Sequence, residues 1–182
     1  MDVRTEATVE DLARVREDGK AELVHGEIVT MSPTGGQPGR AGFKIAMSLE
    51  AYALRTGSGS AIPDNIGFIV DLPNRKSFSP DAAFYSGPVT MSFLRGAPVF
   101  AVEVRSEGDY GPAADQAIAE KRADYFAAGT LVVWDVDLQG DDVIRSYRAD
   151  DPGRPAVFRR GQTATAEPAL PGWSMRVDDL WP

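Results

Sequence analysis

The chain contains no cysteine and only one histidine among its 182 residues. Without cysteine it cannot form disulfides, thiolate nucleophiles, iron–sulfur clusters or cysteine zinc sites. The single imidazole, His25, excludes the zincin histidine pair and most histidine-rich metal centres. Any bound metal would therefore be held mainly by oxygen atoms, which are the ligands that Mg²⁺, Mn²⁺ and Ca²⁺ prefer.

Long hydrophobic runs are also missing, because no stretch of about 18 or more apolar residues occurs. The first ten residues are acidic and polar, whereas a signal peptide starts basic and then becomes apolar. These absences predict a cytoplasmic protein without membrane contact. The composition, 43% hydrophobic and 25% charged, is that of an ordinary globular protein, and no linker, repeat or low-complexity tract interrupts it. We therefore expect one domain.

Basic residues are outnumbered by acidic ones, with 19 Lys and Arg against 27 Asp and Glu and a net charge of −8. The field of the whole molecule repels a polyanion, so nucleic-acid binding would need a local basic patch. Scattered basic residues on an ordinary solvated surface are the alternative interpretation. The candidates are Arg40, Lys44, Arg75, Lys76, Arg95, Arg105 and Arg122.

Several common catalytic and nucleotide-binding motifs are absent from the sequence. It contains no G-x-S-x-G, no G-x-x-x-x-G-K-[ST] and no G-x-G-x-x-G pattern. The glycines at 35, 36 and 39 lack the lysine that a phosphate-binding loop requires. The sequence therefore argues against serine hydrolases of the elbow type, P-loop enzymes and dinucleotide-binding enzymes.

Three helices are predicted from caps and apolar spacing. A capping box at Thr8 opens a short helix that passes Val15 and ends at Gly19. Ile45, Leu49 and Tyr52 repeat at helical spacing up to Gly57, after a loop over residues 32–39. A third helix spans about 113–128, with Pro112 suited to its first turn.

The remaining apolar segments predict strands. Residues 22–31 form a hairpin around His25-Gly26, which we expect at the edge of the main sheet. Strands follow at 66–71, 81–85, 99–104 and 131–136, and a β-meander at 143–147, 156–158 and 173–177, closed by Leu180-Trp181. The strand–helix–strand order over 99–136 predicts a parallel pair. The expected fold class is α/β or α+β, with a mixed central sheet flanked by helices.

Glu103 is a carboxylate in the almost wholly apolar strand 99–104. A strand this apolar is expected to be covered on both faces. A buried carboxylate needs an arginine, a lysine or a metal as partner, because otherwise its pKa rises until it is neutral. An ion pair at a strand end is the simpler alternative to a metal site.

Asp81 and Lys121 are the residues most able to join Glu103. Asp81 follows Pro80 at the mouth of a strand and could approach Glu103 if the two strands pair, although an Asp after Pro is often only a turn residue. Lys121 lies on the same helix face as Ile118 and Tyr125, which places it in an apolar stripe. A lysine that extends to the helix flank is the alternative.

Other acidic residues are weaker candidates for the same site. Glu22 opens the first strand and could join the acidic cluster, whereas Glu27 lies beyond the hairpin turn. Asp135 and Asp137 end a buried strand on one face and could add a ligand. Surface solvation is the ordinary role of the two glutamates, and two aspartates at a strand end more commonly mark a strand that leaves the core.

These motifs together resemble the PD-(D/E)XK nuclease superfamily. Within it, the segments 22–27, 31–33, 79–84, 102–106, 121–129 and 133–135 are similar to successive motifs of the bacterial putative restriction endonuclease family. The resemblance covers residues 6–181 and implies one restriction-endonuclease-like domain over 1–182. It also implies that Asp81 and Glu103 bind Mg²⁺ or Mn²⁺ and that Glu22 belongs to the catalytic set.

The chain departs from that family's pattern at three places. Arg105 stands where the family has a lysine two residues beyond the glutamate, and arginine stays protonated, so Lys121 would take over that role. Pro38 to Arg40 replace a region that often holds a histidine, and Glu107-Gly108 replaces a Pro-Ser pair. Arg40, Lys44 and Arg105 are the expected phosphate contacts.

The leading hypothesis is a metal-dependent DNA endonuclease with Asp81, Glu103, Lys121 and Glu22 as catalytic residues. By analogy with restriction-like nucleases, we expect a homodimer. A catalytically inactive protein that binds nucleic acid or a protein partner is the alternative, and the net charge of −8 suits it. A structural or interaction protein without metal affinity is a third hypothesis.

Overall fold

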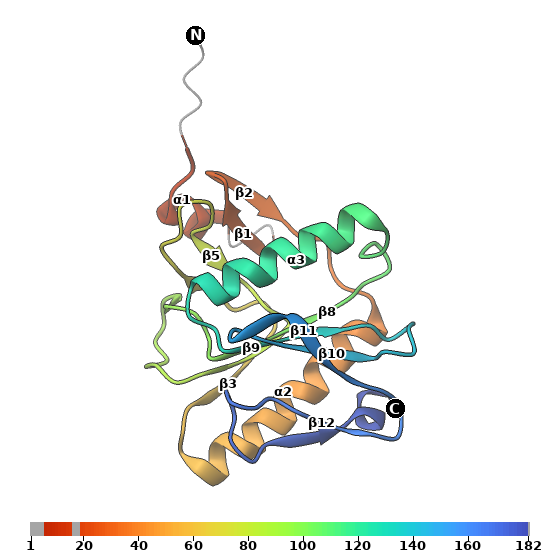
Figure 1. The fold of residues 1–182 in the computed structure, drawn as a ribbon. Helices are drawn as coiled ribbons and strands as arrows, with labels where there is room; N and C mark the ends of the chain where they lie inside the picture. Colours follow the sequence, from red (N-terminus) through yellow and green to blue (C-terminus); the bar gives the residue numbers. More distant parts are fainter. Residues whose placement is uncertain (1–5, 16–18, 182) are drawn as a thin grey trace.

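A six-stranded mixed sheet with one long helix on each face organises the chain (Figure 1). The computed structural model describes residues 6–15 and 19–181. The sheet order is β11-β10-β9-β8-β6-β3. Its strands are β3 (Ser60–Pro63), β6 (Ala82–Tyr85), β8 (Phe100–Val104), β9 (Val132–Val136), β10 (Ile144–Arg148) and β11 (Asp151–Phe158). The predicted fold class, a mixed central sheet flanked by helices, is confirmed.

The two long helices begin and end where the sequence provides suitable residues. Helix α2 (Gly36–Thr56) ends at Gly57, whose left-handed backbone (φ 63°) caps it. It starts at Gly36, inside the segment expected to be a loop. Helix α3 (Pro112–Ala127) starts with proline in its first turn, as predicted. A short helix α1 (Val9–Arg14) has the predicted capping box of Thr8 and Asp11; part of its expected continuation to Gly19 lies outside the described residues.

The N-terminal hairpin, β1 (Ala21–Val24) and β2 (Glu27–Thr30), has the predicted turn at His25-Gly26. The expectation that it lies at the edge of the main sheet is wrong, because β3, which was not predicted, occupies the edge beside β6. The hairpin forms its own two-stranded sheet. It contacts the chain at residues 74–77 instead, where Lys76 N donates to Leu23 O at 2.9 Å.

Two small sheets complete the structure. Strands β4 (Phe68–Ile69), β5 (Ser77–Phe78) and β7 (Leu94–Arg95) form one of them. Strands β12 (Thr163–Thr165) and β13 (Ser174–Arg176) form the other, followed by the 3₁₀ helix η2 (Val177–Leu180). The larger apolar core lies between the sheet, α2 and this C-terminal segment, with Trp134, Phe100 and Trp173 in mutual ring contact. No helix in the described ranges is long and apolar enough to cross a membrane.

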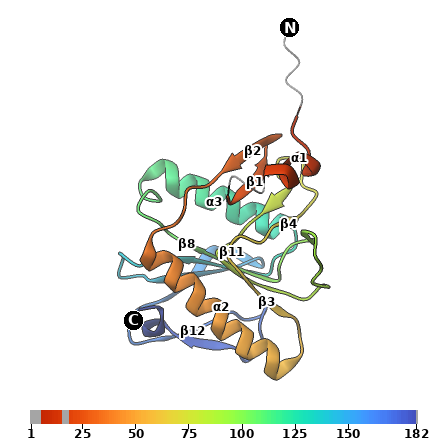
Figure 2. The ribbon, with the colours of Figure 1, turned by 180° about the vertical axis from the view of Figure 1, so that it is seen from behind.

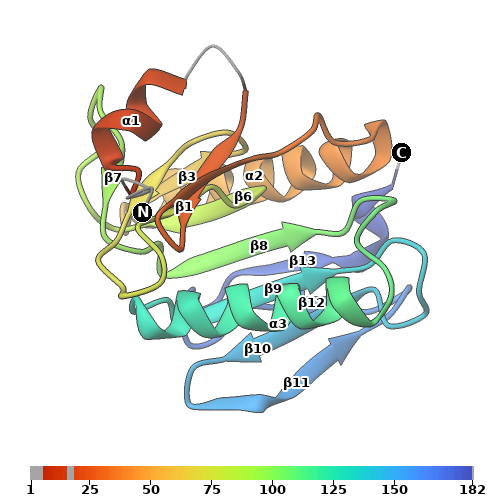
Figure 3. The ribbon, with the colours of Figure 1, turned by 90° about the horizontal axis from the view of Figure 1, so that it is seen from above.

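Strands β8 and β9 are parallel neighbours connected through α3, as the strand–helix–strand order predicted. Seen from above, β8 lies between β6 and β9 in the middle of the sheet (Figure 3). Tyr125 of α3 is fully buried and stacks on Phe78, with ring centroids 4.0 Å apart. This packing fixes α3 above the strand that carries Glu103.

Candidate functional site

Asp81 is fixed beside Glu103 by the antiparallel pairing of β6 and β8. Its backbone N donates to Val102 O at 3.0 Å, and its side-chain Oδ2 accepts from Val104 N at 2.7 Å. The carboxylate therefore bonds to the amide directly after Glu103 in the chain. The structure thus brings the two predicted metal ligands together, one directly before β6 and one near the end of β8.

Lys121 reaches from α3 into this acidic site. Its Nζ lies 2.9 Å from both carboxylate oxygens of Glu103 and 2.9 Å from Oε1 of Glu22. Tyr125, one turn further along α3, donates its hydroxyl to Glu103 Oε1 at 2.7 Å. The four predicted catalytic residues thus lie in one connected cluster, with the lysine bridging two acids.

Glu22 is the most buried acid of the cluster, with 5% of its side chain exposed. Besides Lys121, it accepts from Arg75 Nη1 at 2.6 Å and from the Ser79 amide at 2.8 Å. Arg75 also donates to Asp124 of α3 at 2.8 Å and lies over the ring of Phe78. Glu22 is therefore held by two cations and an amide, which suits a residue that positions Lys121.

The second lysine of the site, Lys20, was not among the sequence candidates. Its Nζ lies 2.7 Å from Asp81 Oδ1 and 2.7 Å from Asp64 Oδ1, and only 15% of its side chain is exposed. Lys20 directly precedes β1, and nothing in its local sequence distinguishes it from a surface lysine. Its role depends on the long-range approach of the hairpin to β6, which no spacing rule reveals.

Burial and the ion pairs together shift the pKa values of the two glutamates in opposite directions. Burial raises the pKa of Glu103, and the nearby Asp81 adds to this against the opposing effect of Lys121. Burial also acts to raise the pKa of Glu22, but Lys121 and Arg75 outweigh it and hold the pKa below its usual value. Burial acts to lower the pKa of Lys121, but Glu103 and Glu22 outweigh it and raise it. Lys121 is therefore a permanent cation near neutral pH.

The cluster opens into a groove of about 1120 Å³, which Lys20, Asp81, Glu103 and Lys121 all line. Its walls are residues 31–38, before and at the start of α2, and residues 104–110, between β8 and α3. The hydroxyls of Thr34 and Ser106 lie 2.8 Å apart and join these two walls. The candidate site therefore has access for a large substrate.

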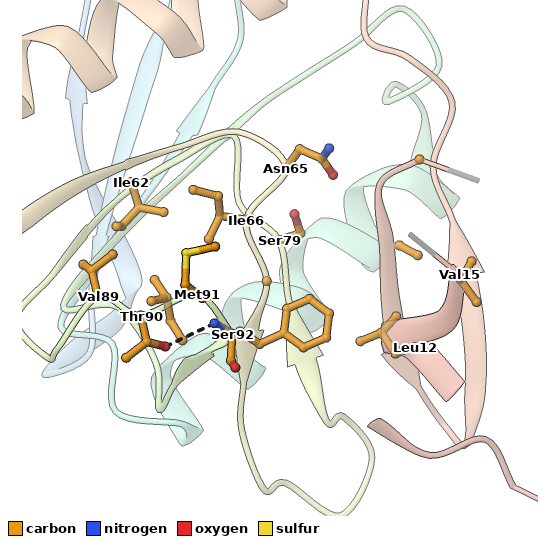
Figure 4. A pocket seen from close by; sticks show the side chains of 15 residues that line it. Leu12, Val15, Ile62, Asn65, Ile66, Ser79, Val89, Thr90, Met91 and Ser92 are labelled. Carbon is orange, nitrogen blue, oxygen red and sulfur yellow. Dashed lines mark hydrogen bonds between the residues drawn. The ribbon is translucent and has the colours of Figure 1, made fainter. Parts of the chain in front are cut away.

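A second, smaller pocket of about 430 Å³ adjoins the groove (Figure 4). It shares Gly19 and Asn65 with the groove and is lined mainly by apolar side chains such as Ile62, Ile66 and Met91. Its described lining contains no charged residue, so it offers neither a carboxylate ligand for a metal nor an acid–base pair. The chemistry is therefore assigned to the groove.

Several predicted phosphate contacts have other partners or lie outside the groove. Arg105 donates to both oxygens of Asp135 at 2.8 Å and to Asp115 at 2.6 Å, although it also lines the groove. Asp135 is thus occupied by Arg105 rather than directed at Glu103. Arg40 and Lys44 lie on α2 beyond the part that lines the groove. The structure does not bring these two basic residues into the acidic cluster.

The donor set suits a hard cation that retains part of its hydration shell. Asp81 and Glu103 supply carboxylate oxygens at an open groove, and Mg²⁺ is commonly bound by one or two carboxylates together with water and substrate phosphates. No cluster of three or more acidic or histidine side chains arranged for metal binding occurs in the described part of the chain. Water and substrate would have to supply the remaining ligands.

Comparisons with known proteins place these observations in context. The chain is similar in structure to the crystal structure of "a putative nuclease belonging to DUF820" from Anabaena variabilis ATCC 29413, with a TM-score of 0.75 and 16% identity over 95% of this chain and 96% of that one. At that identity the likeness shows the fold. No curated protein matches the chain. The family model Uma2, described as "Putative restriction endonuclease", matches residues 7–178. The chain therefore belongs to the Uma2 family.

Proposed function

We propose that the chain is a Mg²⁺- or Mn²⁺-dependent endonuclease that hydrolyses phosphodiester bonds of DNA. The observation that carries this proposal is the convergence of Asp81 and Glu103 at the floor of an open groove, with Lys121 bonded to Glu103. The family match supports the reaction class, because its description names restriction endonucleases. Asp81 and Glu103 are the residues that would hold the metal.

When bound, the metal would supply an activated water and stabilise the charge that develops on the phosphate. Lys121 would donate hydrogen bonds to the reacting phosphate or to the attacking water, because Glu103 and Glu22 raise its pKa and favour the protonated form. Glu22 would act as a positioning residue that holds the lysine through its 2.9 Å contact. Tyr125 would orient Glu103 through its hydroxyl.

Incubation of supercoiled plasmid, linear duplex and single-stranded DNA with the protein in Mg²⁺ or Mn²⁺ tests the proposal. We expect nicking or linearisation of the plasmid that chelator abolishes. Cleavage should fall as salt concentration rises, because binding would rest on local contacts between basic side chains and phosphates, while the net charge of −8 gives no overall attraction to DNA. Intact DNA in every substrate and metal condition would contradict the proposed activity.

Metal binding should also be measurable without DNA. Saturation at about 100 times the dissociation constant should stabilise the native state by roughly 2.7 kcal/mol, because only the folded chain brings Asp81 and Glu103 together. Differential scanning calorimetry with Mn²⁺, Mg²⁺ or chelator measures the shift in Tm. Asp71→Asn, at a surface carboxylate that is 95% exposed, should keep the shift, whereas Asp81→Asn should lose it.

Lys121→Met should lower the cleavage rate by about a hundredfold, because it removes a cation from the position of the developing charge. Lys121→Arg keeps the charge but not the compact geometry, and should recover only part of the rate. Single-turnover kinetics at saturating DNA measure the chemical step. The variant Lys76→Met, at an exposed lysine paired only with Asp71 in the described chain, is the control. A rate in Lys121→Met equal to that of Lys76→Met would remove Lys121 from the mechanism.

A catalytically inactive, nucleic-acid-binding protein is the second candidate function. The observation that favours it is that both presumed ligands carry a lysine partner, Lys20 on Asp81 and Lys121 on Glu103. These ammonium groups neutralise the acids without a metal. The absence of any metal-dependent change in Tm, together with retained DNA binding, would support this alternative over the nuclease.

A further inference from the structure

Helix α2 carries an exposed apolar stripe on the side facing away from the sheet. Phe43 and Met47 are each 56% exposed, and Leu54 is 79% exposed. Figure 2 shows α2 as the outermost layer on this side of the molecule. Exposed apolar side chains that occur singly are ordinary, but these three lie on one face of the same helix.

The stripe has the spacing of a helix–helix seam. Arg40, Phe43, Met47, Glu50 and Leu54 follow one another at intervals of three and four residues, which is the a/d pattern of a heptad repeat. The opposite face of α2, with Ile45, Leu49 and Tyr52, is already buried against the sheet. The helix therefore has two apolar faces, of which only one is used within the described chain.

The two charged members of the stripe lack partners inside the protein. Neither Arg40 nor Glu50 has an ion pair or hydrogen bond through its side chain among residues 6–15 and 19–181. Both side chains are exposed. They lie ten positions apart with Phe43 and Met47 between them, so the stripe has a basic end and an acidic part around an apolar centre.

We propose that this stripe binds the same stripe of a second copy of the chain, with the two α2 helices antiparallel. In one antiparallel register, Met47 of each copy packs on Phe43 of the other, and Arg40 of each pairs with Glu50 of the other. Leu54 then lies over the first turn of the opposite helix, where Gly36 has open space beside it. A parallel pair would instead place Arg40 beside Arg40 and Glu50 beside Glu50, which is repulsive.

The charge pattern therefore selects both the partner and the orientation. A two-fold symmetric pair requires a surface that complements itself. Along α2 the stripe runs from basic Arg40 through two apolar residues to acidic Glu50, so opposite charges meet only when the second helix runs in the opposite direction. The seam spans about 15 residues, or roughly 22 Å of helix. The inference does not depend on nuclease activity.

Sedimentation equilibrium over a concentration series tests the dimer with the full chain. We expect a monomer–dimer equilibrium in the wild type, and a dissociation constant at least about tenfold higher in Phe43→Glu and Met47→Glu. Both positions are more than half exposed, so folding should persist, as circular dichroism can verify. Met91→Glu, at a side chain that is 99% exposed elsewhere on the surface, should dimerise like the wild type.

Charge exchange identifies the register. Arg40→Glu alone and Glu50→Arg alone each create like-charge contacts and should weaken the dimer, whereas the double variant restores opposite charges and should recover it. A wild type that remains monomeric at the highest concentration would overturn the proposal. So would dimers that persist in Phe43→Glu and Met47→Glu, or a double variant no better than either single one.

Discussion

Asp81→Asn and Glu103→Gln should each lower the rate of metal-dependent DNA cleavage by at least about a thousandfold. Each substitution keeps the size of the side chain and removes the negative charge that attracts the cation. Asp81 should also tolerate the change structurally, because an Asn oxygen can still accept from the Val104 amide. The measurement is initial cleavage of plasmid DNA at saturating Mn²⁺, with Tm recorded in parallel.

The matched control for these substitutions is Asp71→Asn, which removes the same charge from an exposed site away from the groove. It should cleave at the wild-type rate. If Asp81→Asn and Glu103→Gln cut as fast as Asp71→Asn, the catalytic centre is not at these acids. If the wild type itself is inactive but binds Mn²⁺ through Asp81, the metal site stands and the cleavage proposal does not.

Arg75→Met should destabilise the folded state by about 3–5 kcal/mol, which is the usual cost of leaving a buried ion-pair partner uncompensated. The Arg75 side chain is 8% exposed and bonds to both Glu22 and Asp124, which tie the hairpin to α3. Methionine fills a similar volume and can still lie on Phe78, so the loss is mainly electrostatic. Urea denaturation followed by tryptophan fluorescence measures the free energy of unfolding.

The comparison for Arg75 is Arg148→Met, which removes an arginine that pairs only with the exposed Asp150 in the described chain. An exposed pair of this kind contributes at most about 1 kcal/mol. A further variant, Arg75→Met with Glu22→Gln, removes the uncompensated charge and should recover part of the lost stability. Equal stability of Arg75→Met and Arg148→Met would show that Glu22 is adequately neutralised by Lys121 alone.

The parts of the site that could be predicted are those whose signal is local. Glu103 stands out because a carboxylate interrupts an apolar strand, and Lys121 because a lysine interrupts an apolar helix stripe. The parallel pairing of β8 and β9 followed from the helix between them. Asp81 was found by its position at the mouth of the neighbouring strand, and the pairing of β6 with β8 confirmed that the two strands are adjacent.

The parts that could not be predicted depend on contacts between segments distant in sequence. Lys20 meets Asp81 across 61 positions, and Arg75 meets Glu22 across 53. The hairpin was assigned to the wrong sheet because β3 is only four residues long and ends in Pro63, so its pattern is weak. The assignment of metal, catalysis, cytoplasmic location and a single domain stays a prediction.

The hairpin carries two site residues of opposite sign, Lys20 just before β1 and Glu22 within it. Because the hairpin is a separate sheet, an opening that detached it from residues 74–77 would withdraw both residues together. Asp81 would lose a cation and Lys121 would lose an anion, while the total charge at the groove would stay the same. Movement of this one segment would thus remove Lys20 from the Asp81 carboxylate and leave Lys121 bonded to Glu103 alone, without changing the net charge at the groove.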